Sequence, residues 1–141
     1  QMYDNLQTTF ANDKQLCLLG FTDQVSLLMD ASDVIFTKPG GITSTEAIVK
    51  NIPIVHTAPI PGLENYNARF FHNHGLSYHS NDTNQQVAIA MRLCEDKAFR
   101  NRMLQQQRLN SNPHTSDDVI DLILNKQEIV YEEQETTHIA R

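Results

Sequence analysis

The chain has 141 residues, 40% of them hydrophobic, which suits one domain with a single core. Its 17 acidic residues against 11 Lys and Arg leave a net charge of -6 without a basic cluster, which argues against a nucleic-acid partner. We find no signal peptide and no apolar run near the ~20 residues that a membrane span requires. Cys17 and Cys94 lie in apolar segments without CxxC spacing. We therefore expect a soluble, cytoplasmic protein with two buried free thiols.

The first third of the chain predicts helix, strand and helix. Apolar residues spaced by four indicate a helix over Met2 to Phe10. The continuous apolar run Leu16 to Leu19 ends at Gly20 and predicts a strand buried on both faces. Asp23 is suited to cap a further helix that ends near Ala31.

Beyond this point, short apolar runs alternate with amphipathic segments. Strands are expected over residues 34–36, 53–56 and 76–78, and helices over 46–50, 64–74, 83–94, 98–107 and 114–125. This alternation predicts an α/β fold, a Rossmann-like parallel sheet with helices on both faces. Ligands of such sheets bind outside the carboxyl ends of the strands. Residues 126–141 are polar and Glu-rich, and we expect a tail there.

The stretch TKPGGITSTEA, residues 37–47, is the strongest local signal. It places a glycine loop between an expected strand and an expected helix, an arrangement that turns backbone N–H groups and the positive end of a helix dipole toward an anion. Gly40 and Gly41 permit close approach of a ligand, and either is able to take a positive φ in a tight turn. A diphosphate fits this pattern, and so does an ordinary strand-to-helix turn.

Three motifs in this order, TKPGG, T-x-x-EA and PIPG-x-E-x-x-NA, resemble the donor-binding half of lipid-linked glycosyltransferases. The most similar group contains monogalactosyldiacylglycerol synthase and the processive diacylglycerol glucosyltransferases, and the peptidoglycan GlcNAc transferase is a more distant relative. The similarity is strong over residues 16–75 and weaker to about residue 125. It implies that residues 1–125 are part of the C-terminal, donor-binding domain of a B-type glycosyltransferase fold, and that the N-terminal acceptor domain is missing.

The resemblance also implies an inverting enzyme that moves a hexose from a UDP-sugar to a lipid such as diacylglycerol, peripherally at the cytoplasmic membrane face. UDP-sugar is then a substrate, so no cofactor is expected. The catalytic base would lie in the acceptor domain, so no catalytic residue is assigned here and the chain alone is expected to be inactive. The residues implied to bind the donor are Phe21 and Thr22 at the uracil, Gly40, Gly41, Ile42 and Thr43 at the diphosphate, Glu46 at the ribose hydroxyls, and Glu64 at the sugar hydroxyls.

Two of these residues have structural interpretations that stay open. Thr43 to Glu46 also reads as a capping box, in which Thr43 caps the helix and Glu46 bonds back to the cap. Glu64 also suits the first turn of its helix, where the dipole stabilises an acidic side chain. Leu63 stands where the family commonly has a polar Gln, which leaves the identity of the sugar open.

The histidines give no metal site. His72 and His74 point about 200° apart on a helix, so they cannot share a metal ion. His56 ends an expected strand, and we interpret it as a hydrogen-bonded structural residue. Two other functions are retained: a donor-binding subunit of a peptidoglycan- or N-glycan-precursor enzyme, and a nucleotide-sugar-binding module without chemistry.

Overall fold

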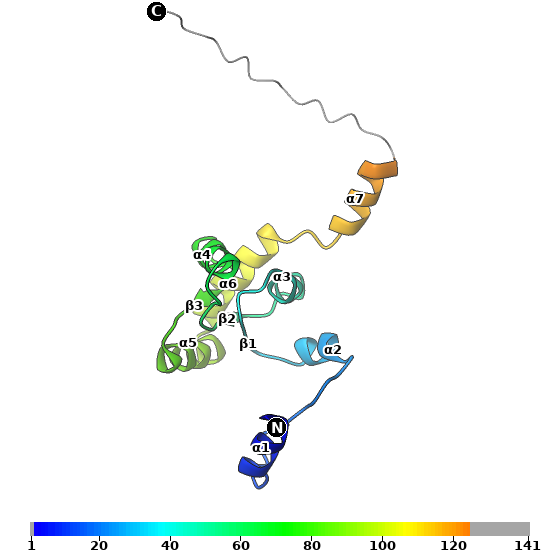
Figure 1. Cartoon of the computed structure of the whole chain (residues 1–141). Helices are drawn as coiled ribbons and strands as arrows, with labels where there is room; N and C mark the ends of the chain where they lie inside the picture. The colour runs from blue at the N-terminus through cyan, green and yellow to red at the C-terminus, as the bar shows by residue number, and fades with distance from the viewer. Residues whose placement is uncertain (1, 125–141) are drawn as a thin grey trace, which may run out of the picture. The chain divides into compact units, whose positions relative to one another are not determined.

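The computed structural model describes residues 2–124. The chain divides into two compact units, residues 1–111 and residues 112–141. In the described part of the first unit, three parallel strands form one sheet in the order β1-β2-β3 (Figure 1). The strands are β1 (Ile35–Thr37), β2 (Ile54–His56) and β3 (Tyr78–His79).

Helices connect these strands (Figure 1). Each strand is followed in sequence by a helix, as parallel pairing requires a crossover. The helices are α1 (Met2–Thr9), α2 (Val25–Asp30), α3 (Gly41–Val49), α4 (Leu63–Asn73), α5 (Thr83–Glu95), α6 (Lys97–Asn110) and, in the second unit, α7 (Thr115–Leu124). No described helix is long and apolar enough to cross a membrane.

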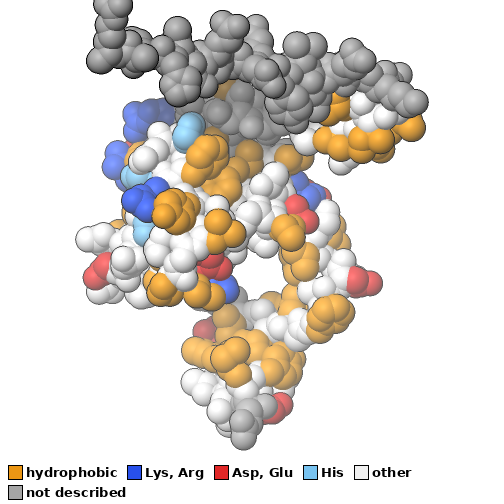
Figure 2. Space-filling view, turned by 45° about the horizontal axis from the view of Figure 1, so that its top comes forward, with side chains coloured by type: hydrophobic (Ala, Val, Ile, Leu, Met, Phe, Trp, Pro, Cys, Tyr) orange, Lys and Arg blue, Asp and Glu red, His pale blue; other side chains and the backbone are white. Residues whose placement is uncertain are grey.

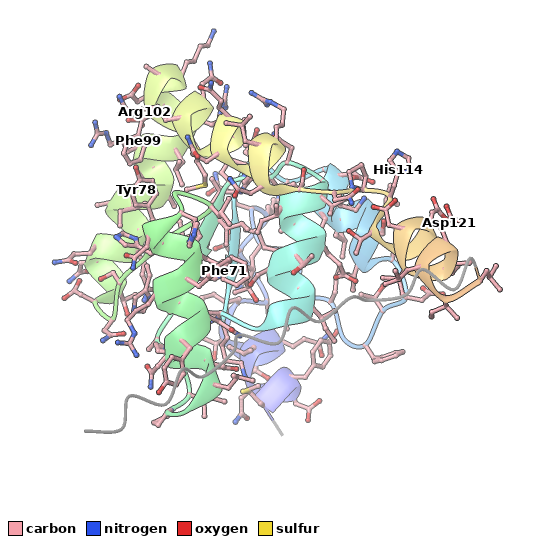
Figure 3. The ribbon with its side chains drawn as sticks, turned by 90° about the horizontal axis from the view of Figure 1, so that it is seen from above. Phe71, Tyr78, Phe99, Arg102, His114 and Asp121 are labelled. Atoms are coloured by element: carbon pink, nitrogen blue, oxygen red, sulfur yellow. The ribbon has the colours of Figure 1, made fainter. Side chains whose placement is uncertain are left out.

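The sheet has a core on each face, because side chains alternate along β2. Ile54 packs with Ala47 and Ile48 of α3 and with Phe71 of α4. Val55 belongs to the opposite core, whose other buried members are Ala90, Leu93, Phe99 and Met103 from α5 and α6. Figure 3 shows Phe71 between α4 and α3, whereas Tyr78 of β3 and Phe99 of α6 lie together with stacked rings. The predicted Rossmann-like α/β fold is confirmed.

Side-chain caps and one buried amide fix α5 and α6. Asp82 accepts a hydrogen bond from the Gln85 N–H at 2.8 Å, and Asp96 accepts one from the Phe99 N–H at 2.9 Å, so both helices begin at an N-cap carboxylate. The fully buried Gln107 donates from Nε2 to the carbonyls of Ile52 and Leu76, both at 2.9 Å. Gln107 therefore ties the end of α6 to the segments that lead into β2 and β3.

The prediction of a buried strand over Leu16 to Leu19 is wrong. The run has no regular secondary structure, and the side chains of Leu16 and Leu19 are 45% and 51% exposed. A strand needs a neighbour to pair with, and no described strand pairs with this run. The two cysteines are exposed rather than buried. Cys17 lies in the unpaired run, and Cys94 lies on the outer side of α5, whose buried neighbour is Leu93.

The start of α2 also differs from expectation. Gln24, not Asp23, precedes α2, and it makes no side-chain cap. In the second unit Asn112 organises the start of α7: its side-chain oxygen accepts from the His114 N–H at 2.9 Å and its carbonyl accepts from Thr115 Oγ1 at 2.7 Å. The apolar side chains of α7 are exposed, as are others across the described surface (Figure 2). The tail predicted for residues 126–141 lies outside the described residues.

Candidate functional site

The carboxyl edge of the sheet carries the two loops that the sequence singles out. Thr37 and His56 are register partners at the ends of β1 and β2, and the Thr57 N–H donates to the Thr37 carbonyl at 2.9 Å. Because the two strands are parallel neighbours, the loop of residues 38–40 and the loop of residues 57–62 leave the sheet on the same side. This is the edge at which ligands of such folds bind.

Polar contacts hold the two loops together. The Lys38 ammonium lies 3.7 Å from Glu64 Oε1, and the Ile60 N–H donates to Glu64 Oε2 at 2.7 Å. Asn67 of α4 donates from Nδ2 to the Pro39 carbonyl at 3.0 Å. Glu64 stands in the first turn of α4, and the preceding Gly62 has φ +115, a conformation that favours glycine. The start of α4 is thus braced against the glycine loop.

The glycine loop opens directly into α3. Gly40 is the residue before the helix, with φ -75 and ψ 143, and Gly41 is the first helical residue. Neither has a positive φ, so the turn does not use the left-handed conformation that glycine permits. A Cβ added at either glycine would meet open space. The helix start has no side-chain cap and no acidic residue in its first turn. Within the described residues, the first N–H groups and the positive end of its dipole thus have no capping side chain.

The structure contradicts the capping-box interpretation of Thr43 and Glu46. Since α3 begins at Gly41, Thr43 is its third residue and Glu46 lies one turn further along. A capping box requires the Ser or Thr to precede the helix. Among the described residues, no hydrogen bond or ion pair engages the exposed Glu46 carboxylate, which leaves both oxygens available to a ligand.

Glu46 lines a cavity of about 320 Å³ between α2 and α3. Met29 is the buried residue in its wall, and the Lys50–Asp30 ion pair, 2.5 Å from Nζ to Oδ1, links the ends of the two helices beside it. The lining residues are Val25, Ser26, Met29, Thr45, Glu46, Val49 and Lys50. The cavity therefore combines an apolar wall with one carboxylate that has no partner among residues 2–124.

The other residues predicted to bind a ligand lie in three places: at the start of α3, before α2 and in the first turn of α4. Gly40, Gly41 and Thr43 form the start of α3, together with the exposed Ile42. Phe21, whose side chain is fully exposed, and Thr22 precede α2, and Thr22 Oγ1 accepts from the Gln24 N–H at 3.1 Å. Glu64 is joined to the glycine loop through Lys38. The exposed Leu63 is the first residue of α4.

Behind the glycine loop lies a buried polar group that sequence reasoning found only in part. His56 Nε2 is 2.9 Å from Ser44 Oγ, and His56 Nδ1 is 2.9 Å from Ser77 Oγ. Burial lowers the pKa of His56 from 6.5 to about 4, and the nearby His79 adds to the effect. The interpretation of His56 as a hydrogen-bonded structural residue is confirmed. Its two serine partners were missed, because no spacing rule connects positions 44, 56 and 77.

Comparison with known families and proteins shows what this chain is similar to. Residues 10–134 match the family described as "Protein of unknown function (DUF354)", and the chain belongs to this family.

Several curated relatives are processive diacylglycerol beta-glucosyltransferases. The protein of Bacillus pumilus is 30% identical over 116 residues, which are 82% of this chain and 30% of that protein. The protein of Staphylococcus carnosus is 30% identical over 103 residues, 73% of this chain and 26% of that protein. The protein of Bacillus thuringiensis is 28% identical over 118 residues, 84% of this chain and 30% of that protein. The resemblance to diacylglycerol glucosyltransferases is thus confirmed, and the chain spans about a third of the length of these relatives.

Proposed function

We propose that this chain binds the UDP-sugar of a glycosyltransferase that transfers a hexose to a lipid hydroxyl, with diacylglycerol as the acceptor. One observation carries the proposal: the uncapped glycine start of α3 faces open space, and the unpaired Glu46 carboxylate of the same helix lines a cavity. The names of the relatives supply the hexose, glucose, and the acceptor.

The start of α3 suits the diphosphate. The N–H groups of its first turn are directed out of the helix. The dipole stabilises a negative charge there by about 0.3–1 kcal/mol at an exposed site, and by more at a site that is shielded from water. Gly40 and Gly41 have no side chain to block a phosphate, and Ile42 and Thr43 add backbone N–H groups. In the transfer step, charge develops on the departing UDP, so these groups stabilise the leaving group.

Glu46 suits the ribose. An ionised carboxylate offers only acceptors, and two adjacent sugar hydroxyls offer two donors. The apolar wall of the cavity, which includes Val25 and Met29, is suited to the flat face of a base. We propose that uracil lies beside the segment of Phe21 and Thr22, whose backbone groups precede α2.

Glu64 has a narrower role than the resemblance implies. Both of its oxygens already have partners, the Ile60 N–H and the Lys38 ammonium. We propose that the main role of Glu64 is to orient Lys38 and the loop of residues 57–62. A sugar hydroxyl would have to donate to a Glu64 oxygen that already has one of these two partners. Leu63 offers no hydrogen bond at the neighbouring position.

The proposed reaction is an inverting displacement. The acceptor oxygen attacks the anomeric carbon, the bond from that carbon to the UDP oxygen breaks, and a base takes the hydroxyl proton. His56 is fully buried and bonded on both nitrogens, so it cannot act as this base. We propose that the base, the lipid pocket and the peripheral membrane contact belong to an acceptor domain outside residues 1–141.

Nucleotide preference tests the proposal. Calorimetry with UDP, ADP and GDP should show UDP binding in preference to the other two, with an affinity that reaches at least millimolar, about -4 kcal/mol. Glu46→Gln should weaken UDP binding by roughly 1–3 kcal/mol, because one acceptor oxygen becomes a donor. The melting temperature should hardly change, because Glu46 is exposed and makes no bond to another described residue.

The matched control is Glu95→Gln, which makes the same change at an exposed residue of α5. This control should leave UDP affinity unchanged. Equal binding of the three nucleotides, or equal losses in the two variants, would contradict the proposed site.

A transfer assay tests the second half of the proposal. Residues 1–141 should bind UDP yet transfer no glucose from UDP-glucose to diacylglycerol, whereas a protein that also contains the acceptor domain should transfer it. Turnover by the 141-residue chain would place the base within it and contradict the division of roles.

A further inference from the structure

Three buried polar side chains join α3 to the middle of the sheet. Ser44 belongs to α3, His56 ends β2, and Ser77 directly precedes β3. Their exposed fractions are 0%, 0% and 2%, and both hydrogen bonds to the imidazole measure 2.9 Å. The Phe71 ring of α4 packs against the imidazole, with 5.4 Å between the ring centroids. Water is therefore excluded from a polar group that lies inside an apolar core.

The neutral form of His56 satisfies both contacts. A neutral imidazole donates from one nitrogen and accepts at the other, and each serine hydroxyl rotates to supply the complement. Burial disfavours the charged ring, which agrees with the lowered pKa of about 4. Losing either serine would leave a buried ring nitrogen without a partner, so each of the two hydrogen bonds contributes to stability.

Ser44 lies on the inner face of α3, directly beside residues proposed to bind the nucleotide. Thr43 precedes it, and the exposed Thr45 and Glu46 follow it. The other inward residues of α3, Ala47 and Ile48, make apolar contacts, which fix neither the rotation nor the height of a helix as a hydrogen bond does. The start of α3 has no side-chain cap to hold it in place.

We propose that His56 is a positioning residue for nucleotide binding: through Ser44 it sets the height and rotation of the start of α3 on the sheet, whereas the Ser77 contact contributes to stability alone. This inference rests on the proposed function. The backbone N–H groups proposed to bind the diphosphate and the Glu46 carboxylate belong to the same rigid helix. A displacement of this helix therefore misplaces both together.

Two substitutions of His56 separate its contacts. Glutamine places its side-chain nitrogen near the position of Nε2 and keeps the Ser44 contact, whereas asparagine is shorter and keeps the Ser77 contact. His56→Gln should bind UDP within about twofold of the wild type, and His56→Asn should bind about 3- to 10-fold more weakly, the equivalent of one lost hydrogen bond. A role in stability alone predicts equal UDP affinities for the two folded variants.

The serines give a second matched pair. Ser44→Ala and Ser77→Ala each remove one buried hydrogen bond of 2.9 Å, so they should lower the melting temperature by similar amounts. Only Ser44→Ala should weaken UDP binding, by about 3- to 10-fold, because only Ser44 belongs to the helix that carries the site. Because Ser44 is fully buried, its side chain cannot contact a nucleotide directly. A loss of UDP affinity in Ser44→Ala therefore reports a change in the position of α3.

Hydrogen exchange tests the inference without any nucleotide. In Ser44→Ala and His56→Asn, the amides of residues 44–48 in α3 should exchange at least about 10-fold faster relative to the amides of α5 than they do in the wild type. Uniform acceleration in both helices, or unchanged exchange in α3, overturns the inference. If the wild type binds no UDP while α3 alone loses protection, the proposed function fails and the positioning of α3 by His56 stands.

Discussion

Two apolar runs of this chain look alike in sequence and differ completely in structure. Leu16 to Leu19 and Ile52 to Val55 are both short runs of four residues. Each consists of large aliphatic side chains apart from its second residue, which is Cys17 in the first run and Pro53 in the second. The second leads into β2 (Ile54–His56), whose residues are all buried, because β1 and β3 pair with it and helices cover both faces. The first is irregular and largely exposed.

The difference shows that an apolar run becomes a strand only where the fold supplies its neighbours. β2 pairs through backbone hydrogen bonds on two sides, whereas the described residues provide no partner for the run at Leu16 to Leu19. Whether an apolar run is buried thus depends on its place in the sheet, and the local sequence pattern alone does not specify it.

The largest expected effect tests this contrast with one kind of substitution. Leu93 is fully buried against Val55, and Leu19 is half exposed in the unpaired run. Leu93→Ala should lower the free energy of unfolding by about 2–5 kcal/mol, since it removes buried apolar surface and leaves a cavity. Leu19→Ala should change it by less than about 0.5 kcal/mol. Urea unfolding followed by circular dichroism measures both values.

Equal losses in the two variants would mean that Leu19 is buried in solution. The two runs would then not differ in burial, and the predicted buried strand over Leu16 to Leu19 would be correct after all.

The second effect concerns His56 at the end of β2. Its pKa is about 4 in the folded chain and 6.5 when unfolded, so between these values the unfolded chain binds a proton that the folded chain does not. Stability therefore falls as the pH drops from 6.5 to 4, by up to about 3 kcal/mol, and this decrease ends below pH 4. Denaturant titrations at several pH values measure the slope.

His56→Gln isolates this contribution from that of the carboxylates, which also titrate in the range. The variant should be less stable at pH 7 and should show a flatter decline between pH 6.5 and 4. Identical slopes in the two proteins would show that the buried ring does not remain neutral in the folded state.

Much of the sheet was predictable because its signals are local. The alternation of short apolar runs with helical periodicity predicted β1, β2 and α4 to α6 with ends that differ by at most a few residues from the structure, and it predicted α3 with a start five residues too late. Gly75, with φ +69 after α4, follows from the need for a left-handed residue at a helix end. The failures at Leu16 to Leu19 and at Cys17 concern burial, which depends on partners distant in sequence.

The candidate site was predictable in its loops and less so in its contacts. The motifs placed Gly40, Gly41 and Glu64 at one edge of the sheet, since parallel strands end on the same side. The sequence did not show that α3 begins at Gly41, because glycine is a poor helix former and Thr43 looked like a better cap. Nor did it show the cavity between α2 and α3, which depends on how the two helices pack.

A smaller effect is expected where a helix start has a true cap. Asp82 precedes α5 and accepts a hydrogen bond from the Gln85 N–H at 2.8 Å. Asp82→Ala should lower the free energy of unfolding by about 1 kcal/mol, because a backbone donor of the first turn loses its partner. Asp82→Asn should retain most of that energy, and an alanine variant as stable as the wild type would contradict the cap.

The smallest effect is expected at the helix start that the sequence misplaced. In a capping box, Thr43→Ala would cost about 1 kcal/mol, as at Asp82. In the structure Thr43 is the third residue of α3, a position where alanine has the higher helix propensity, so the free energy of unfolding should change by less than about 0.5 kcal/mol. Comparing thermal and urea unfolding of Thr43→Ala and Asp82→Ala measures the difference between an uncapped and a capped helix. A loss at Thr43 as large as that at Asp82 would show that α3 begins after Gly41 in solution, and the open glycine start proposed to receive the diphosphate would be lost with it.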